Sequence, residues 1–361
     1  MRIIQVLTTM SFGDAVGNDV LALKKLLKEY GFITEIYAEN IDKRLPAGSV
    51  KNINGFWPDP EDIILYHLST GTKLNEWIMG VKCRKIMRYH NITPYTFFET
   101  YSTVSMELCQ KGQEQMRMLK DTFDLVLAVS EFNKRDLENA GYHCPIAVLP
   151  ILIPFADYEK KPSSFILKKY EADFVNFIFV GRIAPNKCQE DVIHTFYLYH
   201  KYYNPKSRLF LVGSYTGMER YYQRLLDYTE RLGAENVIFT GHIKFDEILA
   251  YYNLADVFVC MSEHEGFCVP LVEAMYFGVP VVAYDSSAIG DTLGGTGLLL
   301  GDKNPLECAA LIDHMIRHEN VRTTIIEKQK RRLEDFSYNA IGEQFLRMIE
   351  EFIRKDSREK A

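Results

Sequence analysis

The sequence lacks the marks of several protein classes. No apolar run in its 361 residues reaches the ~18 residues that a membrane span needs. Its 42 basic residues are fewer than its 48 acidic ones, and the net charge of −6 predicts no nucleic-acid partner. The seven cysteines form no C-x-x-C pair, which argues against a zinc knuckle or a disulfide framework. The N-terminus carries one Arg and a short apolar stretch, so we expect no signal peptide and a cytoplasmic protein.

The composition is that of an ordinary globular protein, with 47% apolar and 25% charged residues. The length corresponds to two or three domains of roughly 150 residues. Short apolar segments alternate with longer helical patterns, which predicts a parallel sheet covered on both faces. In the first half the expected strands are RIIQVLT (2–8), ITEIYAE (33–39), DIILYHLS (62–69), KIMRYHNI (85–92) and DLVLAVS (124–130).

Between the first two strands, residues 20–32 predict a helix with Leu21, Leu23, Leu26 and Leu27 on one face. The proline-containing stretch 149–165 interrupts the alternation and predicts an interdomain connection. The alternation then restarts. The expected strands of the second half are NFIFVGR (176–182), RLFLVGS (208–214), NVIFTGH (236–242), DVFVCMS (256–262) and PVVAYDS (280–286).

This pattern predicts two Rossmann-like, doubly wound α/β domains facing across a cleft. The expected boundaries are 1–150 and 151–338, followed by an amphipathic helix over 339–361 that crosses back to the first domain. Ligands of such sheets bind at the carboxyl ends of the strands, so functional residues are expected just after strands.

The segment SEHEGFCVPLVEAMYFGVPVVA (262–283) follows one of these strands. A glycine-bearing loop that leads into a helix beginning near Pro270 presents backbone N–H groups and a helix dipole, which together favour an anion. Glu265 and Glu273 place two carboxylates there, and each can accept hydrogen bonds from a vicinal diol. The alternative is that both acids only complement the helix dipole.

Two cations follow another strand, in FVGRIAPNKCQEDVI (179–193). Arg182 offers a planar fork and Lys187 a point charge, and together they suit a diphosphate. The alternative is a solvated loop pair that binds no ligand.

The motif E-G-F-x-x-P-x-x-E-A-M, followed by G-x-P-V-V, resembles the signature of glycosyltransferase family 4. Members of that family are retaining, nucleotide-sugar-dependent enzymes of GT-B fold, and the resemblance extends over nearly the whole chain. It implies that the first domain lies on the acceptor side and that the second binds the nucleotide-sugar donor.

The resemblance also implies roles for individual residues. Glu265 would lie against the donor sugar, and Glu273 would bind the donor ribose. The family's G-R-…-K pattern matches Gly181, Arg182 and Lys187, which would hold the diphosphate. The amides of Gly266, Phe267 and Cys268 would approach sugar hydroxyls and phosphate.

The first domain offers two candidate features. Gly13 and Gly17 follow the first strand, where the family often has Gly-Gly and where backbone can approach a ligand closely. The family also places a histidine near the donor sugar. His90 matches it better by strand order, with His67 as the rival. The predicted catalytic residues are therefore His90, Glu265, Arg182 and Lys187.

The implied reaction is transfer of a hexose from a GDP-mannose or UDP-hexose donor to a saccharide or lipid-linked saccharide in surface polysaccharide synthesis. The resemblance implies no metal and no cofactor. Lys24, Lys25 and Lys28 could touch an anionic membrane surface, although a solvated helix face is the simpler interpretation. The alternatives are a nucleotide-sugar epimerase or sugar phosphorylase of the same fold, and a two-domain sugar-binding protein without catalysis.

Overall fold

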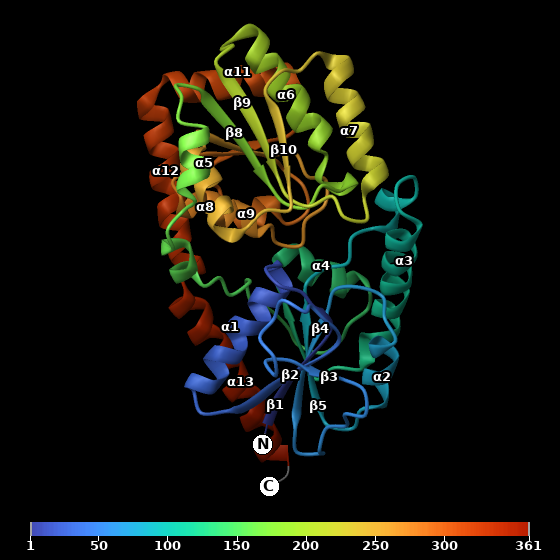
Figure 1. The fold of residues 1–361 in the computed structure, drawn as a ribbon. Helices are drawn as coiled ribbons and strands as arrows, with labels where there is room; N and C mark the ends of the chain where they lie inside the picture. Colours follow the sequence, from blue (N-terminus) through green and yellow to red (C-terminus); the bar gives the residue numbers. More distant parts are fainter. Residues whose placement is uncertain (1, 360–361) are drawn as a thin grey trace. The chain divides into compact units, whose positions relative to one another are not determined.

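The computed structural model describes residues 2–359 and forms two compact units. One unit comprises Met1–Tyr95, Glu107–Phe155 and Asp335–Ala361, and the other comprises Thr96–Met106 and Ala156–Glu334. Each unit contains one sheet with parallel strand ladders, flanked by helices (Figure 1). The α/β class and the two Rossmann-like sheets that the sequence predicts are therefore confirmed.

The first unit has a seven-stranded sheet. Its strands in spatial order are β3 (Lys51–Asn52), β2 (Ile33–Ile41), β1 (Arg2–Met10), β4 (Ile63–Leu68), β5 (Arg84–Tyr89), β6 (Leu125–Ala128) and β7 (Ile146–Val148). Neighbouring residues of β1 belong to different core clusters, Ile3 to one and Ile4 to the other. Because successive side chains of a strand point to opposite faces, both faces of this sheet are buried.

The second unit has a six-stranded sheet. Its spatial order is β10 (Val237–Gly241), β9 (Ser207–Val212), β8 (Val175–Val180), β11 (Val257–Cys260), β12 (Val281–Tyr284) and β13 (Leu298–Leu300). In both units the strand order reverses direction once, between β1 and β4 in the first and between β8 and β11 in the second. Such reversals are the switch points at which parallel α/β sheets bind ligands.

Helices fill the crossovers between strands. In the first unit they are α1 (Ala15–Glu29), α2 (Leu74–Gly80), α3 (Thr103–Met118, whose first turn belongs to the second unit), α4 (Glu131–Asn139) and α13 (Tyr338–Glu359). The second unit has α5 (Ser164–Lys169), α6 (Gln189–Tyr202), α7 (Glu219–Leu232), α8 (Phe245–Leu254), α9 (Val269–Tyr276), α10 (Ile289–Leu293), α11 (Pro305–Arg317) and α12 (Glu319–Leu333).

The buried face of α1 differs from the prediction at one position. Leu23, Leu26 and Leu27 are buried, whereas Leu21 is 38% exposed. The prediction for Leu21 was wrong because residues two apart point to different sides of a helix. The buried stripe of α1 instead receives α13, which lies beside it in Figure 1 and contributes Ile341 to the same core cluster.

Candidate functional site

The predicted site residues follow the strands at the two switch points. In the first unit, Gly13 lies between β1 and α1, and His90 follows β5, the neighbour of β4. In the second unit, Arg182 follows β8, and Glu265 lies in the loop between β11 and α9. The topology of each sheet thus gathers residues that are distant in sequence.

Glycines let the ends of β8 and β9 approach each other in the second unit. Gly213 has a φ of +153°, and a Cβ placed on it would lie 1.9 Å from the carbonyl oxygen of Gly181. No side chain can occupy that position without moving the strands. Position 213, next to Gly181, therefore requires glycine for structural reasons. The predicted contact of Gly181 with a ligand stays a prediction.

Lys187 and Glu265 form an ion pair at the carboxyl end of this sheet. Lys187 closes the short 3₁₀ turn Pro185–Lys187, and its Nζ lies 2.5 Å from Oε2 of Glu265. The side chains are 19% and 9% exposed. Burial disfavours the charged ammonium, but the negative charge of Glu265 outweighs it and raises the pKa of Lys187. Lys187 therefore keeps its positive charge at neutral pH.

The loop that carries Glu265 is held from both sides. The Asn186 side chain donates to the carbonyl oxygen of His264 at 3.0 Å. On the other side, the Glu265 amide donates to the Ser287 hydroxyl at 2.8 Å, and the Thr292 hydroxyl donates to the carbonyl oxygen of Phe267 at 2.5 Å. Phe267 itself is 4% exposed, so its ring belongs to the core and a ligand could reach only its backbone.

The same loop ends in the N-terminus of α9. Cys268 is the N-cap in the left-handed conformation, with φ +70°, and Pro270 lies in the first turn, as predicted. Among residues 2–359, no acceptor receives the backbone N–H of Gly266 or of Cys268. Unpaired amides at the positive end of a helix dipole form a site for an anion.

Glu273 lies one turn further along α9. Its Oε1 accepts a hydrogen bond from the Tyr158 hydroxyl at 2.9 Å, and its Oε2 accepts one from the Tyr252 hydroxyl at 2.7 Å. Burial raises the pKa of Glu273, partly offset by these two bonds. A carboxylate has about four acceptor positions, so two remain for a diol. Sequence reasoning missed both tyrosines, because nothing local indicates that 158 and 252 approach 273.

Arg182 is exposed at the end of β8 and extends toward a different loop. Its Nη2 donates to the carbonyl oxygen of Thr216, between β9 and α7, at 3.2 Å. The structure therefore places the two predicted cations on the same sheet edge with different partners. Their joint contact with a diphosphate stays a prediction.

Two histidines meet in the first unit. His67 Nδ1 lies 2.9 Å from His90 Nε2, and His67 Nε2 lies 3.0 Å from the side-chain oxygen of Gln5. The Gln5 amide nitrogen donates to the carbonyl oxygen of Val20, which fixes the orientation of the amide. Burial lowers the pKa of both histidines, so both are neutral at pH 7.

This chain of contacts sets the tautomers of both rings. His67 donates from Nε2 to Gln5, so its Nδ1 can only accept, and His90 must donate from Nε2. The Nδ1 atom of His90 is then an acceptor, and it is buried without a partner among the described residues. Both ring nitrogens of His67 are taken. Of the two rivals, only His90 has a nitrogen left for a sugar hydroxyl.

Arg88 and Asp19 form a buried ion pair beside these rings. Both side chains are 0% exposed, and Arg88 Nε lies 2.9 Å from Asp19 Oδ2. The guanidinium also donates to the carbonyl oxygens of Leu149 and Pro150, and Asp19 accepts from the amide of Leu152. All these partners lie within the first unit and tie α1, β5 and the segment after β7 together.

Gly13 and Gly17 have different surroundings. Gly13 has a φ of +79° and open space around its missing side chain. At Gly17 a Cβ would lie 2.6 Å from the carbonyl oxygen of Ser11, and the Gly17 amide already donates to the Asp14 side chain. Asp14 is the N-cap of α1. Ligand contact by either glycine stays a prediction.

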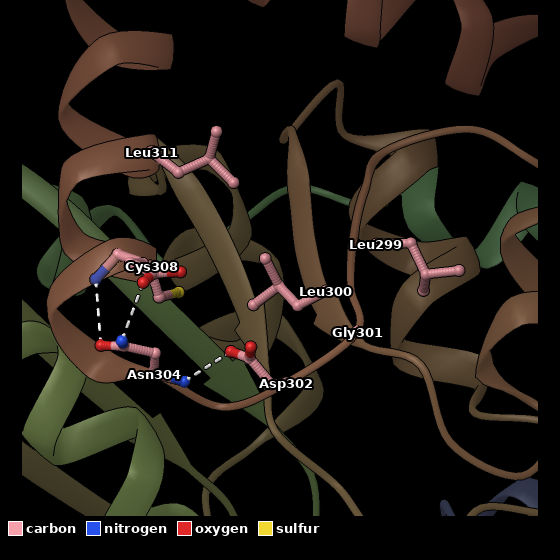
Figure 2. A pocket seen from close by; sticks show the side chains of 8 residues that line it. Leu299, Leu300, Gly301, Asp302, Asn304, Cys308 and Leu311 are labelled. Atoms are coloured by element: carbon pink, nitrogen blue, oxygen red, sulfur yellow. Dashed lines mark hydrogen bonds between the residues drawn. The ribbon is translucent and has the colours of Figure 1, made fainter.

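A separate pocket of about 330 Å³ lies between β13 and α11, lined by Leu299, Leu300, Gly301, Asp302, Asn304, Glu307, Cys308 and Leu311 (Figure 2). Its polar groups pair with one another. Asn304 caps α11 and donates to Glu307, and its backbone amide donates to Asp302. This pocket therefore presents leucine side chains and a helix cap.

Among the described residues, no helix has the length and apolar character needed to cross a membrane.

Sequence comparison finds proteins that are similar to this chain. Residues 160–332 match the family described as glycosyl transferases group 1. The chain is 25% identical over 240 residues to O-antigen chain mannosyltransferase B of Escherichia coli, covering 65% of this chain and 61% of the relative. It is 36% identical over 146 residues to a GDP-mannose-dependent alpha-mannosyltransferase of Mycolicibacterium smegmatis, covering 38% and 34% respectively. The matches thus span about a third to three fifths of these curated relatives.

Solved structures match nearly the whole chain. Sucrose-phosphate synthase from Thermosynechococcus elongatus has a TM-score of 0.76 at 16% identity, with 98% of this chain and 100% of the other covered. HepE of Anabaena in complex with UDP and glucose has a TM-score of 0.73 at 20% identity, with 97% and 100% covered. At these identities the likeness shows the fold. Residues 160–332 therefore resemble the glycosyl transferases of group 1, and the chain has the GT-B fold of these solved structures.

Proposed function

We propose that the protein is a retaining hexosyltransferase that uses a nucleoside-diphosphate sugar, with GDP-mannose as the first candidate donor. A saccharide or lipid-linked saccharide of a surface polysaccharide would be the acceptor. The observation that carries the proposal is the Lys187–Glu265 pair beside the unpaired amides of α9, at the switch point of a unit that resembles group 1 glycosyl transferases. The names of the mannosyltransferase relatives support mannose, and a UDP-hexose is the second candidate.

The chemistry follows from where charge develops. When the glycosyl bond breaks, negative charge grows on the departing diphosphate. Lys187 has three N–H donors and one carboxylate partner, so donors remain for a phosphate oxygen. Arg182 and the amides of Gly266 and Cys268 would complete the set. Such preorganised donors stabilise a developing anion by about 3–4 kcal/mol each when they are placed in a dry site.

The carboxylates and the histidine would act on the sugar and the ribose. Glu265 would position the transferred hexose and balance positive charge on its ring, and Glu273 would accept from the ribose diol. His90 would accept a hydroxyl hydrogen through Nδ1. Attack by the acceptor on the face that the diphosphate leaves would retain the anomeric configuration, with the leaving phosphate taking the acceptor's proton. The proposal assigns no step to a metal or a cofactor.

A panel of nucleotide sugars tests the donor. A ligand at 100 times its Kd raises the unfolding free energy by about 2.7 kcal/mol, so the donor should raise the Tm more than its competitors. NMR of the product formed from GDP-mannose and a mannoside acceptor should then show an α-linked sugar.

Each other outcome has a distinct meaning. A Tm increase by UDP-sugars alone would overturn the choice of mannose. Epimerisation of the donor without an acceptor, or a requirement for free phosphate as co-substrate, would overturn the transferase. Tight binding of free sugar without the nucleotide would favour a binding protein.

A further inference from the structure

Two buried cysteines flank the loop that carries Glu265. Cys260 is the last residue of β11, and Cys268 is the N-cap of α9. Their sulfur atoms and a carboxylate oxygen of Glu265 all lie within 4.8 Å of one another. The three residues are 0%, 8% and 8% exposed in the order Cys260, Cys268, Glu265. The proposed transfer uses neither thiol, so the reaction does not account for two cysteines at this place.

We propose that Cys260, Cys268 and Glu265 form a binding site for a thiophilic divalent cation, with Zn²⁺ as its representative. Zn²⁺ prefers a tetrahedron of thiolate, imidazole and carboxylate ligands, with Zn–S distances of about 2.3 Å. Two sulfurs of such a tetrahedron lie about 3.8 Å apart. Atoms already within 4.8 Å therefore reach ligand geometry by small side-chain rotations. The fourth position remains for water.

Charge balance favours the ion at this place. The Lys187 ammonium and the Glu265 carboxylate cancel each other, and a thiol of ordinary pKa, about 8.5, carries its proton at neutral pH. When Zn²⁺ binds, two S–H bonds break, two Zn–S bonds form, and two protons leave for solvent. The net charge of the buried cluster is then zero before and after binding. This matters because an uncompensated buried charge costs several kcal/mol.

A second group of ligand atoms, in the first unit, does not meet this condition. Asp19, His67 and His90 also offer atoms within 4.8 Å of one another. However, the Arg88 guanidinium holds Asp19, and the buried neutral histidines would bind an ion through a lone pair without releasing a proton. A divalent ion would add its full charge to a buried cluster that is already neutral.

A third group, Cys188, Asp191 and Glu263, lies in the second unit. It has a single thiol, and the Lys303 ammonium already bridges its two carboxylates at 2.9 and 2.7 Å. An ion would have to displace that lysine from both carboxylates, whereas at Cys260 and Cys268 it would displace Lys187 from one. Cys188 is therefore the matched control for the site at Cys260 and Cys268.

A bound ion would change the loop that the transfer depends on. It would hold Glu265 between two thiolates and draw the carboxylate away from Lys187. We therefore expect Zn²⁺ to compete with the nucleotide sugar. The cation site stands apart from the proposed function, and only this expected inhibition rests on it.

Titration with Cd²⁺ tests the site directly. The reduced full chain is titrated while thiolate-to-cadmium charge-transfer absorption is recorded in the ultraviolet, for wild type, C260A and C188S. We expect one tight ion per chain in the wild type and in C188S. C260A should bind at least about 100-fold more weakly, because losing a ligand costs more than losing an outer-shell partner. Equal affinity in the wild type and C260A, or a loss in C188S alone, would overturn the proposal.

Two further measurements keep the test decisive. If C260A does not fold, C268G removes the other thiol at a position whose φ of +70° suits glycine, and it should show the same loss. Zn²⁺ should raise the Tm of the wild type and of C188S but not that of C260A. If no transfer activity is found at all, the absorption and Tm data still decide the cation site, so the two proposals can fail separately.

Discussion

Both units bury an ion pair at the carboxyl end of a parallel sheet, but the two pairs have different surroundings. In the first unit Arg88 and Asp19 are 0% exposed, and backbone carbonyls and an amide take up further donor and acceptor positions. In the second unit Lys187 and Glu265 are 19% and 9% exposed, and Glu265 is the carboxylate partner of Lys187. Unpaired amides lie in the same loop as Glu265.

This difference separates a structural pair from a pair that can bind a ligand. Arg88 and Asp19 bond each other and backbone groups of residues 149–152, so the pair holds α1, β5 and that segment together. The ammonium of Lys187 keeps donors that a phosphate oxygen could use. Burial, charge and position at a switch point are common to both pairs, so they do not distinguish them. The pairs differ in the number of hydrogen-bond positions that remain for a ligand.

The largest expected effect is on the pair in the first unit. Replacing Arg88 by Met leaves the Asp19 carboxylate buried without its cation, which costs about 3–5 kcal/mol. Native-state hydrogen exchange of peptides from β4 and β5 measures this locally. The double variant R88M/D19L removes both charges and should recover much of the loss. A single-variant cost below about 1 kcal/mol would contradict the structural role of the pair.

The next effect concerns catalysis in the second unit. Lys187→Ala should lower turnover by about two to three orders of magnitude, because it removes a donor that acts where charge develops. Initial rates at saturating donor measure it, and circular dichroism checks that the variant is folded. Lys303→Ala is the matched control, since Lys303 also bridges carboxylates in this unit. Equal losses in both variants would mean that the comparison between structural and functional pairs fails.

A smaller effect is expected at Glu273. Glu273→Gln removes the charge while keeping the shape, and a hydrogen bond to a charged group is worth about 1.5–3 kcal/mol. Donor affinity measured by calorimetry should therefore fall by roughly 10- to 150-fold. Tyr252→Phe keeps the carboxylate and frees one of its acceptor positions, so it should bind the donor about as well as the wild type. Weaker binding by both variants would mean that Glu273 holds Tyr158 and Tyr252 in place and does not contact the donor.

Local sequence patterns predicted most of the fold. The ten expected strands all form, because buried parallel strands are continuous apolar runs that can be recognised without knowing their neighbours. The shorter strands β3, β7 and β13 were missed. Two or three residues give no periodicity, and their pairing is decided by the sheet edge they meet. The error at Leu21 has a local cause, since Leu21 lies two residues from the buried Leu23 and points to another side of α1.

The candidate site was predictable where a motif is contiguous and hidden where partners are distant. Glu265 and Glu273 share one segment with the loop and the helix N-terminus, so their spacing could be interpreted directly. The partners of Glu273 are 115 and 21 residues away, and those of Arg88 lie 61 to 69 residues away. Such contacts depend on tertiary packing, which single-sequence reasoning does not contain.

The smallest effect is a difference in pH dependence between the units. Burial lowers the pKa of His67 and His90, so below pH 6.5 the unfolded chain binds protons that the folded first unit does not. Stability is therefore complete above pH 6.5 and falls on acidification, by up to about 1.4 kcal/mol per pH unit for each histidine. In the second unit burial lowers the pKa of His264 to about 4, which acts in the same direction. The raised pKa of Glu273 acts in the opposite direction, because its folded form binds protons more readily.

Hydrogen exchange of peptides from each unit, followed between pH 6.5 and 5.5 with the intrinsic exchange rates corrected for pH, measures both slopes in one sample. We expect the slope of the first unit to be at least twice that of the second, since two buried histidines oppose protonation there, whereas in the second unit His264 does so and Glu273 acts in the opposite direction. His67→Leu leaves one of the two buried histidine rings in the first unit, so the slope of that unit should fall by about half. If the slope in the first unit is unchanged in this variant, the buried histidines take up protons without unfolding. The assignment of His90 as a neutral ring with Nδ1 as an acceptor would then be wrong.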